Sequence, residues 1–424
     1  MSTQSTRVGV VGLGYVGLPL ALSMHNAGYE VVGVDVDPDT IEHLRAGDST
    51  VSDVSDSKVT DAVAEGLQFT TDYAELADVD GVSVCVPTPL RKTDTPDLSF
   101  VVDAAERLAG VVPPGCTVVL ESTVYPGATE EVVGETLADS GAEIGEDVHL
   151  AFSPERIDPG NEAYGPTEIP KVLGGVTPAC GDRAEALYGA VFEEVVRVDS
   201  ATEAELVKLL ENTFRAVNIG LINELAQVAH ELDVDIWNAI DAAETKPFGY
   251  MSFYPGPGLG GHCIPVDPFY LSWKANEHGI DTRFIDLADT VNREMPDHVV
   301  RRVVEQLNDR GTPLPESDVL VVGVAYKPDV SDTRESPAVD IIDGLEEWHA
   351  DVEYHDPHVP ALSVGERTYE SVPLTDERVA AADCVVLVTD HGAIDVERLA
   401  ERSSLLFDTR NATAGLEADG VVRL

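Results

Sequence analysis

A cysteine lies inside an unusually glycine-rich stretch of the chain, GPGLGGHCIP at 256–265. Glycine lowers the stability of ordered structure, so four glycines in ten residues indicate a backbone that must pass very close to another group. A thiolate is a strong nucleophile, and Cys263 in such a loop predicts a nucleophile presented to a ligand. A tight turn with an incidental cysteine is the alternative interpretation.

A long helical pattern carries a second group of reactive side chains. Residues 202–232 are apolar around much of the helix circumference, which predicts a helix buried on several sides. Lys208 and Asn212 lie four positions apart on one face, and Asn223 lies three turns further along it. The chain has only seven lysines, so a lysine in this apolar setting is a candidate site residue. The apolar excess also predicts a two-fold homodimer through this helix.

The first 35 residues contain a dinucleotide-binding fingerprint. An apolar strand at 8–11 leads into GLGYVG, then a helix, then a second strand that ends at Asp35. The glycines allow a tight turn, close approach of the pyrophosphate and helix packing, while the acid accepts hydrogen bonds from the ribose hydroxyls. No arginine follows Asp35, so NAD is favoured over NADP. The fingerprint residues are Gly12, Leu13, Gly14, Tyr15, Val16 and Gly17.

Three further runs, GVSVCVPTP, CTVVLEST and DVHLAFSPER, read as strands that end in polar or proline-bearing residues. The carboxyl ends of parallel strands hold the ligands of an open sheet, so Thr88, Thr123 and Glu155 are expected at such an edge. Strand patterns return in DVLVVGVAYKPD, DVEYHDP, DCVVLVTDH and SLLFDTRN, which predict a second, smaller Rossmann-like domain without the glycine fingerprint. Two nucleotide-type domains predict two ligands, NAD and a second nucleotide.

The predicted fold is therefore α/β in three parts. An NAD-binding Rossmann domain at 1–197 precedes a central helical region at 198–311, which carries the cysteine loop and the dimer contact. A Rossmann-like domain at 312–424 completes the chain.

The composition of the chain indicates the kind of environment in which the protein works and excludes some classes of partner. The chain has 77 acidic and 27 basic residues, and the net charge of −50 is spread over every segment. Such a surface needs salt to screen its self-repulsion, which indicates a salt-rich cytoplasm of a halophilic archaeon. It excludes nucleic acid as a partner, because nothing would neutralise the phosphates. The five dispersed cysteines indicate neither disulfides nor a zinc site, and neither an export signal nor a membrane span is evident.

Over nearly its whole length the sequence resembles the UDP-glucose/GDP-mannose dehydrogenase family. The resemblance rests on seven motifs in the family's order, VGLGYVGLPLA, CVPTPL, ESTVYPG, FSPERIDPGN, ENTFRAVNIGLINELA, GPGLGGHCIPVDPFYL and GVAYKPDVSDTRESPA. It implies oxidation of the C6 alcohol of a nucleotide sugar to a carboxylate with two NAD in sequence. Cys263 would form the thiohemiacetal and the thioester, and the glycines would let the chain lie against the sugar.

The stretch KPFGYMSFYPGPGLGGHCIPVDPFYLSWKA most resembles the UDP-N-acetylglucosamine 6-dehydrogenase branch. Tyr254 stands where the UDP-glucose branch has a basic residue, which favours an acetamido sugar. UDP-N-acetylmannosamine and UDP-glucose stay open as alternative substrates. A two-electron hydroxyacid dehydrogenase and a non-catalytic NAD-binding protein are the alternatives from other classes. The cysteine loop and the second α/β domain argue against both.

The resemblance also implies roles for individual residues. Lys208 and Asn212 would stabilise negative charge on the C6 oxygen, and Asp267 would pair with Lys208. Thr123 and Glu155 would hold or activate the hydrolytic water. The implied cofactor contacts beyond the fingerprint are Asp35, Thr88, Thr123 and Arg334, with no metal. The implied substrate contacts are Glu155, Arg156, Lys208, Asn212, Tyr254, Gly258, Gly260, Lys327 and Arg410.

Overall fold

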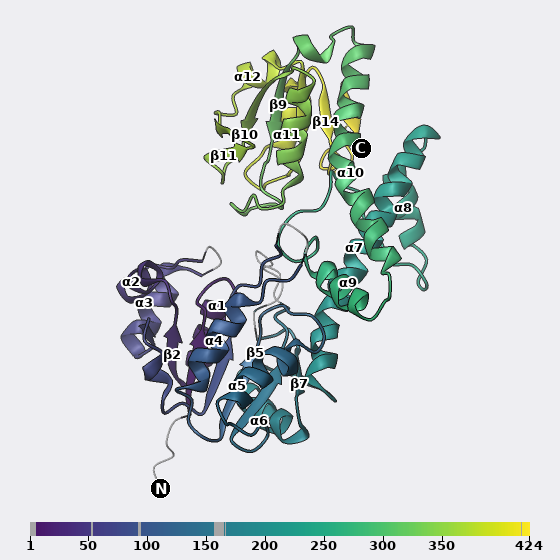
Figure 1. The fold of residues 1–424 in the computed structure, drawn as a ribbon. Helices are drawn as coiled ribbons and strands as arrows, with labels where there is room; N and C mark the ends of the chain where they lie inside the picture. The colour runs from purple at the N-terminus through teal and green to yellow at the C-terminus, as the bar shows by residue number, and fades with distance from the viewer. Residues whose placement is uncertain (1–5, 52–53, 92–94, 157–164, 166, 417) are drawn as a thin grey trace. The chain divides into compact units, whose positions relative to one another are not determined.

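The structure is a computed structural model that describes residues 6–51, 54–91, 95–156, 165, 167–416 and 418–424. The chain forms two compact units (Figure 1). Unit 1 comprises Met1–Glu211 and Phe269–Ile280, and unit 2 comprises Asn212–Pro268 and Asp281–Leu424. Each unit contains one main parallel sheet, which confirms the predicted α/β fold with a Rossmann domain at each end of the chain.

Unit 1 contains an eight-stranded sheet in the order β3-β2-β1-β4-β5-β6-β7-β8. All neighbours are parallel except β6 and β7, which run antiparallel. The strand order reverses between β1 and β4, so a crevice for a ligand is expected at their carboxyl ends. The strands are β1 (Arg7–Val11), β2 (Glu30–Val34), β3 (Gln68–Thr70), β4 (Gly81–Val84), β5 (Cys116–Leu120), β6 (Val148–Phe152), β7 (Lys171–Gly175) and β8 (Val195–Val198).

Short helices connect these strands, and several begin at the side chains expected to cap a helix. Asp37 accepts a hydrogen bond from the N–H of Asp39 at the start of α2, and Thr177 accepts one from Cys180 at the start of α6. A proline follows each cap, where its missing N–H is harmless. The helices are α1 (Gly17–Asn26), α2 (Pro38–Ala46), α3 (Asp56–Glu65), α4 (Ser99–Ala109), α5 (Glu135–Asp139) and α6 (Pro178–Tyr188), with short turns η1 (Tyr73–Leu76) and η2 (Thr129–Gly134).

Unit 2 contains a five-stranded parallel sheet in the order β10-β9-β13-β14-β15, which reverses between β9 and β13. A separate antiparallel hairpin, β11–β12, was not predicted from the sequence. The strands are β9 (Asp318–Val322), β10 (Asp351–His355), β11 (Ala361–Val364), β12 (Arg367–Glu370), β13 (Cys384–Leu387), β14 (Leu406–Asp408) and β15 (Val421–Arg423). The helices are α8 (Ile236–Glu244), α10 (Arg283–Asp309), α11 (Pro337–Glu347), α12 (Asp376–Ala381) and α13 (Val396–Arg402), with the turn η3 (Leu314–Glu316).

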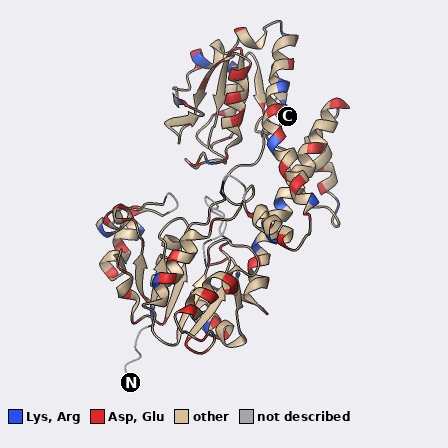
Figure 2. Ribbon diagram, in the orientation of Figure 1, with Lys and Arg blue, Asp and Glu red and all other residues tan. Residues whose placement is uncertain are grey.

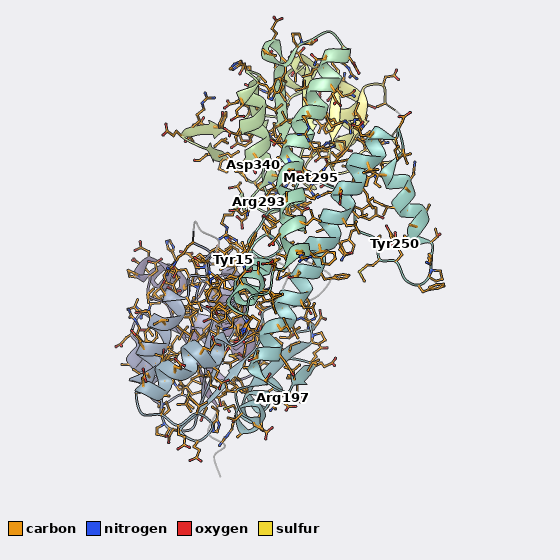
Figure 3. All side chains as sticks on the ribbon, turned by 45° about the vertical axis from the view of Figure 1, so that its right-hand side comes forward. Tyr15, Arg197, Tyr250, Arg293, Met295 and Asp340 are labelled. Atoms are coloured by element: carbon orange, nitrogen blue, oxygen red, sulfur yellow. The ribbon has the colours of Figure 1, made fainter. Side chains whose placement is uncertain are left out.

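The long helix α7 (Ala201–Glu231) matches the predicted helix at 202–232. Close packing of its second half on α10 depends on Gly220, because a Cβ there would lie 3.1 Å from the Cα of Ala288. Further along, Gln227 donates to the sulfur of Met295, which lies on α10 (Figure 3).

Burial of α7 on several sides was predicted, with a second copy covering part of its surface, and within the single chain one stripe of the helix is exposed. The exposed apolar side chains of this stripe recur at intervals of three, four or seven residues: Leu206, Leu210, Phe214, Leu221, Leu225, Val228 and, just beyond the helix, Leu232. We call these seven residues the α7 stripe.

Acidic residues occur on the helices and loops of both units, and basic residues are sparse (Figure 2). The charge is therefore a property of the folded surface, as the sequence predicted. Across the described residues, every helix is too short or too polar to span a bilayer.

Candidate active site

The loop between β1 and α1 has the geometry that a dinucleotide needs. Gly12 has a φ of +86°, and a Cβ there would lie 2.7 Å from the carbonyl oxygen of Cys85. A Cβ at Gly17 would lie 1.7 Å from the oxygen of Gly12. At Gly14, by contrast, a Cβ would meet no described atom within 4 Å, so the backbone here faces open space. Tyr15 beside it is exposed (Figure 3).

Asp35 follows β2 and is tied to this loop. Its Oδ2 accepts a hydrogen bond from the backbone N–H of Leu13 at 2.8 Å, and its Oδ1 accepts one from Asp37 at 3.0 Å. Each carboxylate oxygen keeps a lone pair for a second donor. The open backbone at Gly14, the start of α1 and this oriented acid together fit the pyrophosphate and ribose of NAD.

The polar residues after β4, β5 and β6 lie along one edge of the unit 1 sheet, because these strands are parallel. Thr88 is half-buried, and its carbonyl accepts a hydrogen bond from Tyr270 at 2.6 Å. Thr123 is also half-buried. Ser122 joins two of the strand ends, since its Oγ donates to the carbonyl of Val86 at 2.7 Å. The prediction that Thr88, Thr123 and Glu155 follow these strands is confirmed.

Glu155 and Arg156 follow β6 and make different contacts. The N–H of Arg156 donates to Oε1 of Glu155 at 2.6 Å, and Nζ of Lys171 lies 3.2 Å from Oε2. The Arg156 guanidinium instead holds Glu211 through two hydrogen bonds, of 2.6 and 3.1 Å. The remainder of the FSPERIDPGN motif, after Arg156, lies outside the described residues.

In unit 2, Cys263 lies in the turn that leads into α9 (Asp267–Glu277). Its carbonyl accepts hydrogen bonds from the N–H groups of Val266 at 3.2 Å and Asp267 at 2.8 Å. The residue is exposed, whereas the other four cysteines are buried. The sequence-based distinction between a presented thiol and core cysteines such as Cys85 and Cys384 is therefore confirmed as a difference in exposure.

The glycines of the cysteine loop pack against protein atoms. A Cβ at Gly256 would lie 3.1 Å from Nη1 of Arg410, and one at Gly260 would lie 2.7 Å from both the carbonyl oxygen of Glu335 and the Cβ of Tyr326. A Cβ at Gly261 would lie 2.8 Å from the Tyr326 ring. Gly258 adopts a φ of +136° beside Pro337. Close approach of the loop glycines is confirmed for protein atoms of the second α/β domain, and their contact with the sugar stays a prediction.

Asn212 and Asp267 form a direct pair in unit 2. Nδ2 of Asn212 donates to Oδ2 of Asp267 at 2.6 Å, and Asp267 is 2% exposed. Since the N–H of Asp267 also binds the carbonyl of Cys263, the three residues form one connected group. Lys208 is half-buried on α7, one turn before Asn212.

Three cationic side chains predicted as contacts follow strands of the second sheet. Arg410 follows β14, and its Nε donates to the carbonyl of Val388 at 2.7 Å. Burial lowers the pKa of its guanidinium, and the nearby Asp390 and Asp408 oppose that change. Lys327 lies after β9 with its Nζ 5.6 Å from the centre of the Tyr326 ring. Arg334 is exposed, and its Nε binds Asp332 at 2.8 Å.

Tyr254 contacts helix α8. Its ring stacks on Trp237 with centroids 5.8 Å apart, and its hydroxyl donates to Asp241 at 3.0 Å. The hydrogen bond to this carboxylate raises the pKa of Tyr254 to about 12. The side chain is therefore a neutral hydrogen-bonding group that ties the start of the cysteine loop to α8.

Comparison with known proteins finds a family match over almost the whole chain. The sequence matches three domains of one family: the NAD binding domain over residues 6–192, the central domain over 202–294 and the UDP binding domain over 320–415. The chain belongs to the UDP-glucose/GDP-mannose dehydrogenase family. As a member of this family it is an NAD-dependent nucleotide-sugar dehydrogenase.

Among its relatives, the chain is 35% identical to the UDP-N-acetyl-D-glucosamine 6-dehydrogenase of Pseudomonas aeruginosa, over 95% of this chain and 96% of the relative. It is 32% identical to the UDP-N-acetyl-D-mannosamine dehydrogenase of Methanococcus maripaludis strain C7, over 96% of this chain and 92% of the relative. The structure of the UDP-D-ManNAc dehydrogenase from Pyrococcus horikoshii matches with a TM-score of 0.88 at 32% identity, covering 99% of this chain and 98% of that one.

The structure of this dehydrogenase contains two buried pairs of ionisable side chains that were not predicted from the sequence. One is the pair Lys171 and Glu121 in unit 1, whose Nζ and Oε2 lie 2.6 Å apart. The other is Asp356 with His391 in unit 2, where Nε2 of His391 lies 2.9 Å from Oδ2 of Asp356. This carboxylate also accepts from the N–H groups of Val324 and Ala325, so it shapes the loop after β9. Burial alone would raise the pKa of Asp356, but hydrogen bonds from His391 and from the N–H groups of Val324 and His358 lower it to about 2.

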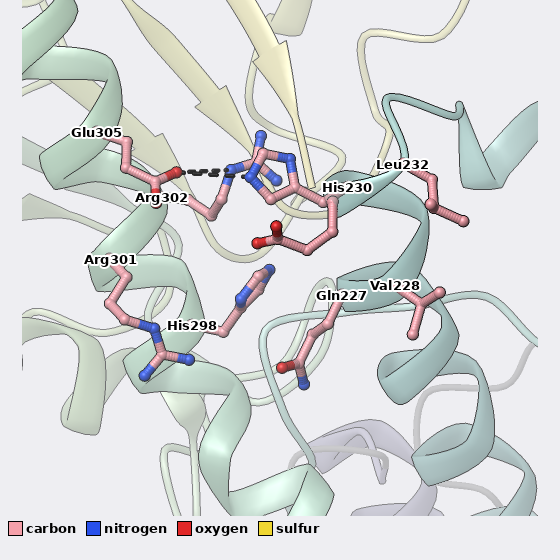
Figure 4. A pocket seen from close by; sticks show the side chains of 9 residues that line it. Gln227, Val228, His230, Leu232, His298, Arg301, Arg302 and Glu305 are labelled. Atoms are coloured by element: carbon pink, nitrogen blue, oxygen red, sulfur yellow. Dashed lines mark ion pairs between the residues drawn. The ribbon is translucent and has the colours of Figure 1, made fainter.

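A separate cavity of about 360 Å³ lies between the end of α7 and α10 (Figure 4). Its polar side chains face one another: Oε2 of Glu305 lies 3.8 Å from Nε of Arg302 and 3.5 Å from Nε2 of His230. Burial lowers the pKa of His298 on its wall to about 4. None of the site residues predicted from the sequence lines this cavity.

The predicted site residues divide between the two units. Unit 1 holds Gly12, Leu13, Gly14, Tyr15, Val16, Gly17, Asp35, Thr88, Thr123, Glu155, Arg156 and Lys208. Unit 2 holds Asn212, Tyr254, Gly258, Gly260, Cys263, Asp267, Lys327, Arg334 and Arg410.

Proposed function

We propose that this dehydrogenase oxidises the C6 alcohol of a UDP-N-acetylhexosamine to the uronate, in two steps that share Cys263. The observation that carries the proposal is the cysteine loop itself. It presents an exposed thiol while Gly256 and Gly260 pack against Arg410 and Tyr326 of the UDP binding domain. A sugar whose nucleotide is held by that domain would therefore extend toward a nucleophile on a loop packed against it.

The fingerprint loop and Asp35 would hold NAD, which supplies a hydride acceptor for each oxidation. In the first step the alcohol loses its hydroxyl proton as the hydride leaves, and an aldehyde results. Lys208 and Asn212 would stabilise the negative charge that develops on the C6 oxygen. Asp267 would orient Asn212 through their hydrogen bond and pair with Lys208. Thr88, Thr123 and Arg334 would complete the cofactor contacts.

In the second step the Cys263 thiolate would add to the aldehyde carbon and form a thiohemiacetal. Loss of a second hydride gives a thioester, which water can hydrolyse. The water oxygen bonds to C6, the C–S bond breaks, and Glu155 with Thr123 would hold the water and accept its proton. The sum is one alcohol, two NAD⁺ and one water giving one carboxylate, two NADH and three protons.

UDP-N-acetylglucosamine is the substrate that the motif resemblance favours, with Tyr254 as the departure from the UDP-glucose branch. UDP-N-acetylmannosamine is the second candidate, because the Methanococcus and Pyrococcus relatives carry that activity in their names. The sugars differ only in the configuration at C2, so a parallel assay of both separates them. Glu155, Arg156, Lys208, Asn212, Tyr254, Gly258, Gly260, Lys327 and Arg410 are the proposed substrate contacts.

We also propose that the protein acts as a homodimer through the α7 stripe. Burying apolar surface lowers the free energy of an association by about 25 cal/mol per Å², so an exposed apolar stripe favours association with a second copy. The proposed functional parts remain 1–197, 198–311 and 312–424, and the family matches to 6–192, 202–294 and 320–415 support that division.

The test is the stoichiometry of the reaction in molar KCl. We expect two NADH for each UDP-sugar consumed, with no free aldehyde. Cys263→Ser should stop the second oxidation and leave NAD binding intact, because a neutral hydroxyl is a far weaker nucleophile toward the aldehyde carbon than a thiolate. One NADH per UDP-sugar in the wild type would mean that the oxidation stops after two electrons, at the aldehyde, and would refute the thioester step.

A further inference from the structure

Unit 1 contains a buried ion cluster next to Glu155. Lys171 is 3% exposed and Glu121 is 1% exposed, and their Nζ and Oε2 atoms are 2.6 Å apart. Removing two charges from water costs several kcal/mol per ion, so a fold keeps such a pair only with good geometry or a use for it. Neither residue has a part in the reaction sequence described above.

The antiparallel step in the sheet brings this lysine to Glu155. Phe152 pairs with Gly174 and Ala151 pairs with Gly175. Continuing this register by three residues past Phe152 sets Glu155 opposite Lys171, at the start of β7. Nζ of Lys171 accordingly lies 3.2 Å from Oε2 of Glu155, so one ammonium group bridges two carboxylates.

The rest of the cluster fixes Glu121 and Lys171 in place. The Tyr188 hydroxyl donates to Oε1 of Glu121, and Ser83 Oγ lies 2.8 Å from that hydroxyl. Nζ of Lys171 also lies 5.2 Å from the centre of the Phe192 ring. Burial lowers the pKa of Lys171, but the two carboxylates outweigh this effect and the pKa lies above its usual value. Burial raises the pKa of Glu121, and Lys171 partly offsets that rise.

We infer that Lys171 and Glu121 are positioning residues for the hydrolytic step, which set the charge and direction of the Glu155 carboxylate. Lys171 binds Oε2 and the Arg156 N–H binds Oε1, so both oxygens of Glu155 are oriented by donors. The nearby ammonium favours the ionised carboxylate, whereas the Glu121 charge opposes it. The inference rests on the role proposed above for Glu155.

Two substitutions should shift the titration midpoint of the Glu155 carboxyl group in opposite directions. Lys171→Met removes the ammonium group that lies beside the Glu155 carboxylate, so the titration midpoint of Glu155 should rise by about one pH unit. Glu121→Gln removes the opposing negative charge while Gln still accepts from Tyr188, so the midpoint should fall. If Lys171 and Glu121 served only in packing, the two substitutions would not shift the titration midpoint in opposite directions. The double variant Lys171→Met/Glu121→Gln removes both charges of the buried Lys171–Glu121 pair, so neither residue is left as an unpaired ion, and it guards against misfolding of the single variants.

The experiment measures the pH dependence of kcat for all three variants in 3 M KCl, where exposed charges are screened and buried ones are not. For Lys171→Met, the fall of kcat on the acid side of the pH profile should shift to higher pH, with about a tenfold loss of kcat at a given pH on that side. For Glu121→Gln, the same fall should shift to lower pH. The other titratable groups of the cluster, Tyr188 and Cys85, have pKa values raised by burial and stay neutral in this range. Lys58→Met, at an exposed position on α3, makes the same change in net charge and should shift nothing.

A second readout needs no substrate. In protein labelled with ¹³C at glutamate carboxyls, subtraction of the Glu155→Gln spectrum isolates the Glu155 signal for titration. Midpoints that agree in wild type, Lys171→Met and Glu121→Gln would overturn the inference, as would equal losses of kcat at every pH. If the wild type forms only one NADH per sugar, the proposed function fails, and the ¹³C titration still decides whether Lys171 and Glu121 act on Glu155.

Discussion

The side chain of Asn223 on α7 anchors the start of the cysteine loop, since its Oδ1 accepts a hydrogen bond from the N–H of Gly256 at 3.0 Å. Its Nδ2 donates to Oδ1 of Asn292 on α10 at 2.9 Å, so one fully buried amide joins three segments of unit 2. The loop that carries Cys263 is thereby tied to two helices at its first glycine.

Asn223→Ala should destabilise unit 2 by about 1–3 kcal/mol, because it leaves the Gly256 N–H buried without an acceptor. Freed at this end, the loop should also expose Cys263 to faster alkylation by iodoacetamide. Thermal unfolding and mass spectrometry of the labelled cysteine, both in molar KCl, measure the two effects. Asn218→Ala is the matched control, at a half-buried position on the same helix where the side-chain amide donates to the carbonyl of Phe214. Equal alkylation rates in both variants would show that the hydrogen bond does not hold the loop.

The α7 stripe should hold the dimer together. Leu225→Glu places a carboxylate in the proposed interface, where an unpaired buried charge costs several kcal/mol, so dimer dissociation should increase by at least about 100-fold. Phe100→Glu changes an exposed apolar residue on α4 in the same way and should leave the dimer intact. Sedimentation velocity in 3 M KCl measures both. A wild-type monomer under these conditions would refute the dimer.

Activity should depend on salt because a net charge of −50 opposes both association and the binding of two anionic ligands. The Debye length is about 10 Å at 0.1 M and about 3 Å at 1 M, so only molar salt screens neighbouring charges on one surface. We expect the KM for the UDP-sugar to fall and the dimer to strengthen between 0.1 and about 3 M KCl. As the salt concentration is lowered, the dimer should dissociate first, and the units should unfold only at a still lower salt concentration. An intact, fully active dimer at 0.1 M would mean that the acidity serves another purpose.

Stability should also carry a pH signature from Glu205 on α7. Its carboxylate accepts from the N–H and Oγ1 of Thr129 at 2.7 and 2.6 Å, yet burial outweighs these bonds and raises its pKa to about 7. Because the pKa in the folded state lies above the ordinary glutamate value of 4.5, the folded state binds the proton more tightly than the unfolded state. The contribution to stability is complete below pH 4.5 and is lost as the pH rises to about 7.

Glu205→Gln should remove this part of the pH dependence, an effect of a few kcal/mol at most. Unfolding free energies between pH 4.5 and 8, in 3 M KCl to screen the exposed carboxylates, give the comparison. Glu203→Gln, on the exposed side of the same helix, should retain the wild-type slope. Parallel curves for wild type and Glu205→Gln would contradict the prediction.

Local patterns in the sequence were sufficient for the elements that depend on neighbouring residues. The glycine spacing at Gly12 and Gly14 specifies a turn and a helix start, and an acid follows at the end of the next strand, so the NAD site could be predicted. The helical periodicity of α7 likewise set its limits to within one residue at each end. Apolar strand runs around Cys85 and Cys384 predicted two buried cysteines, and the structure confirms both.

Contacts between distant residues were decided only by the tertiary structure. Lys171 reaches Glu155 because β7 runs antiparallel to β6, and the direction of a strand is set by its partner rather than by its own sequence. The glycines around Cys263 could be predicted to lie close to something, but only the fold identifies Tyr326 and Arg410 as their neighbours. The α7 stripe appeared as apolar excess in the sequence, and its exposure in the single chain is what points to a second copy. Periodicity specifies which face of a helix is apolar; packing decides what covers it.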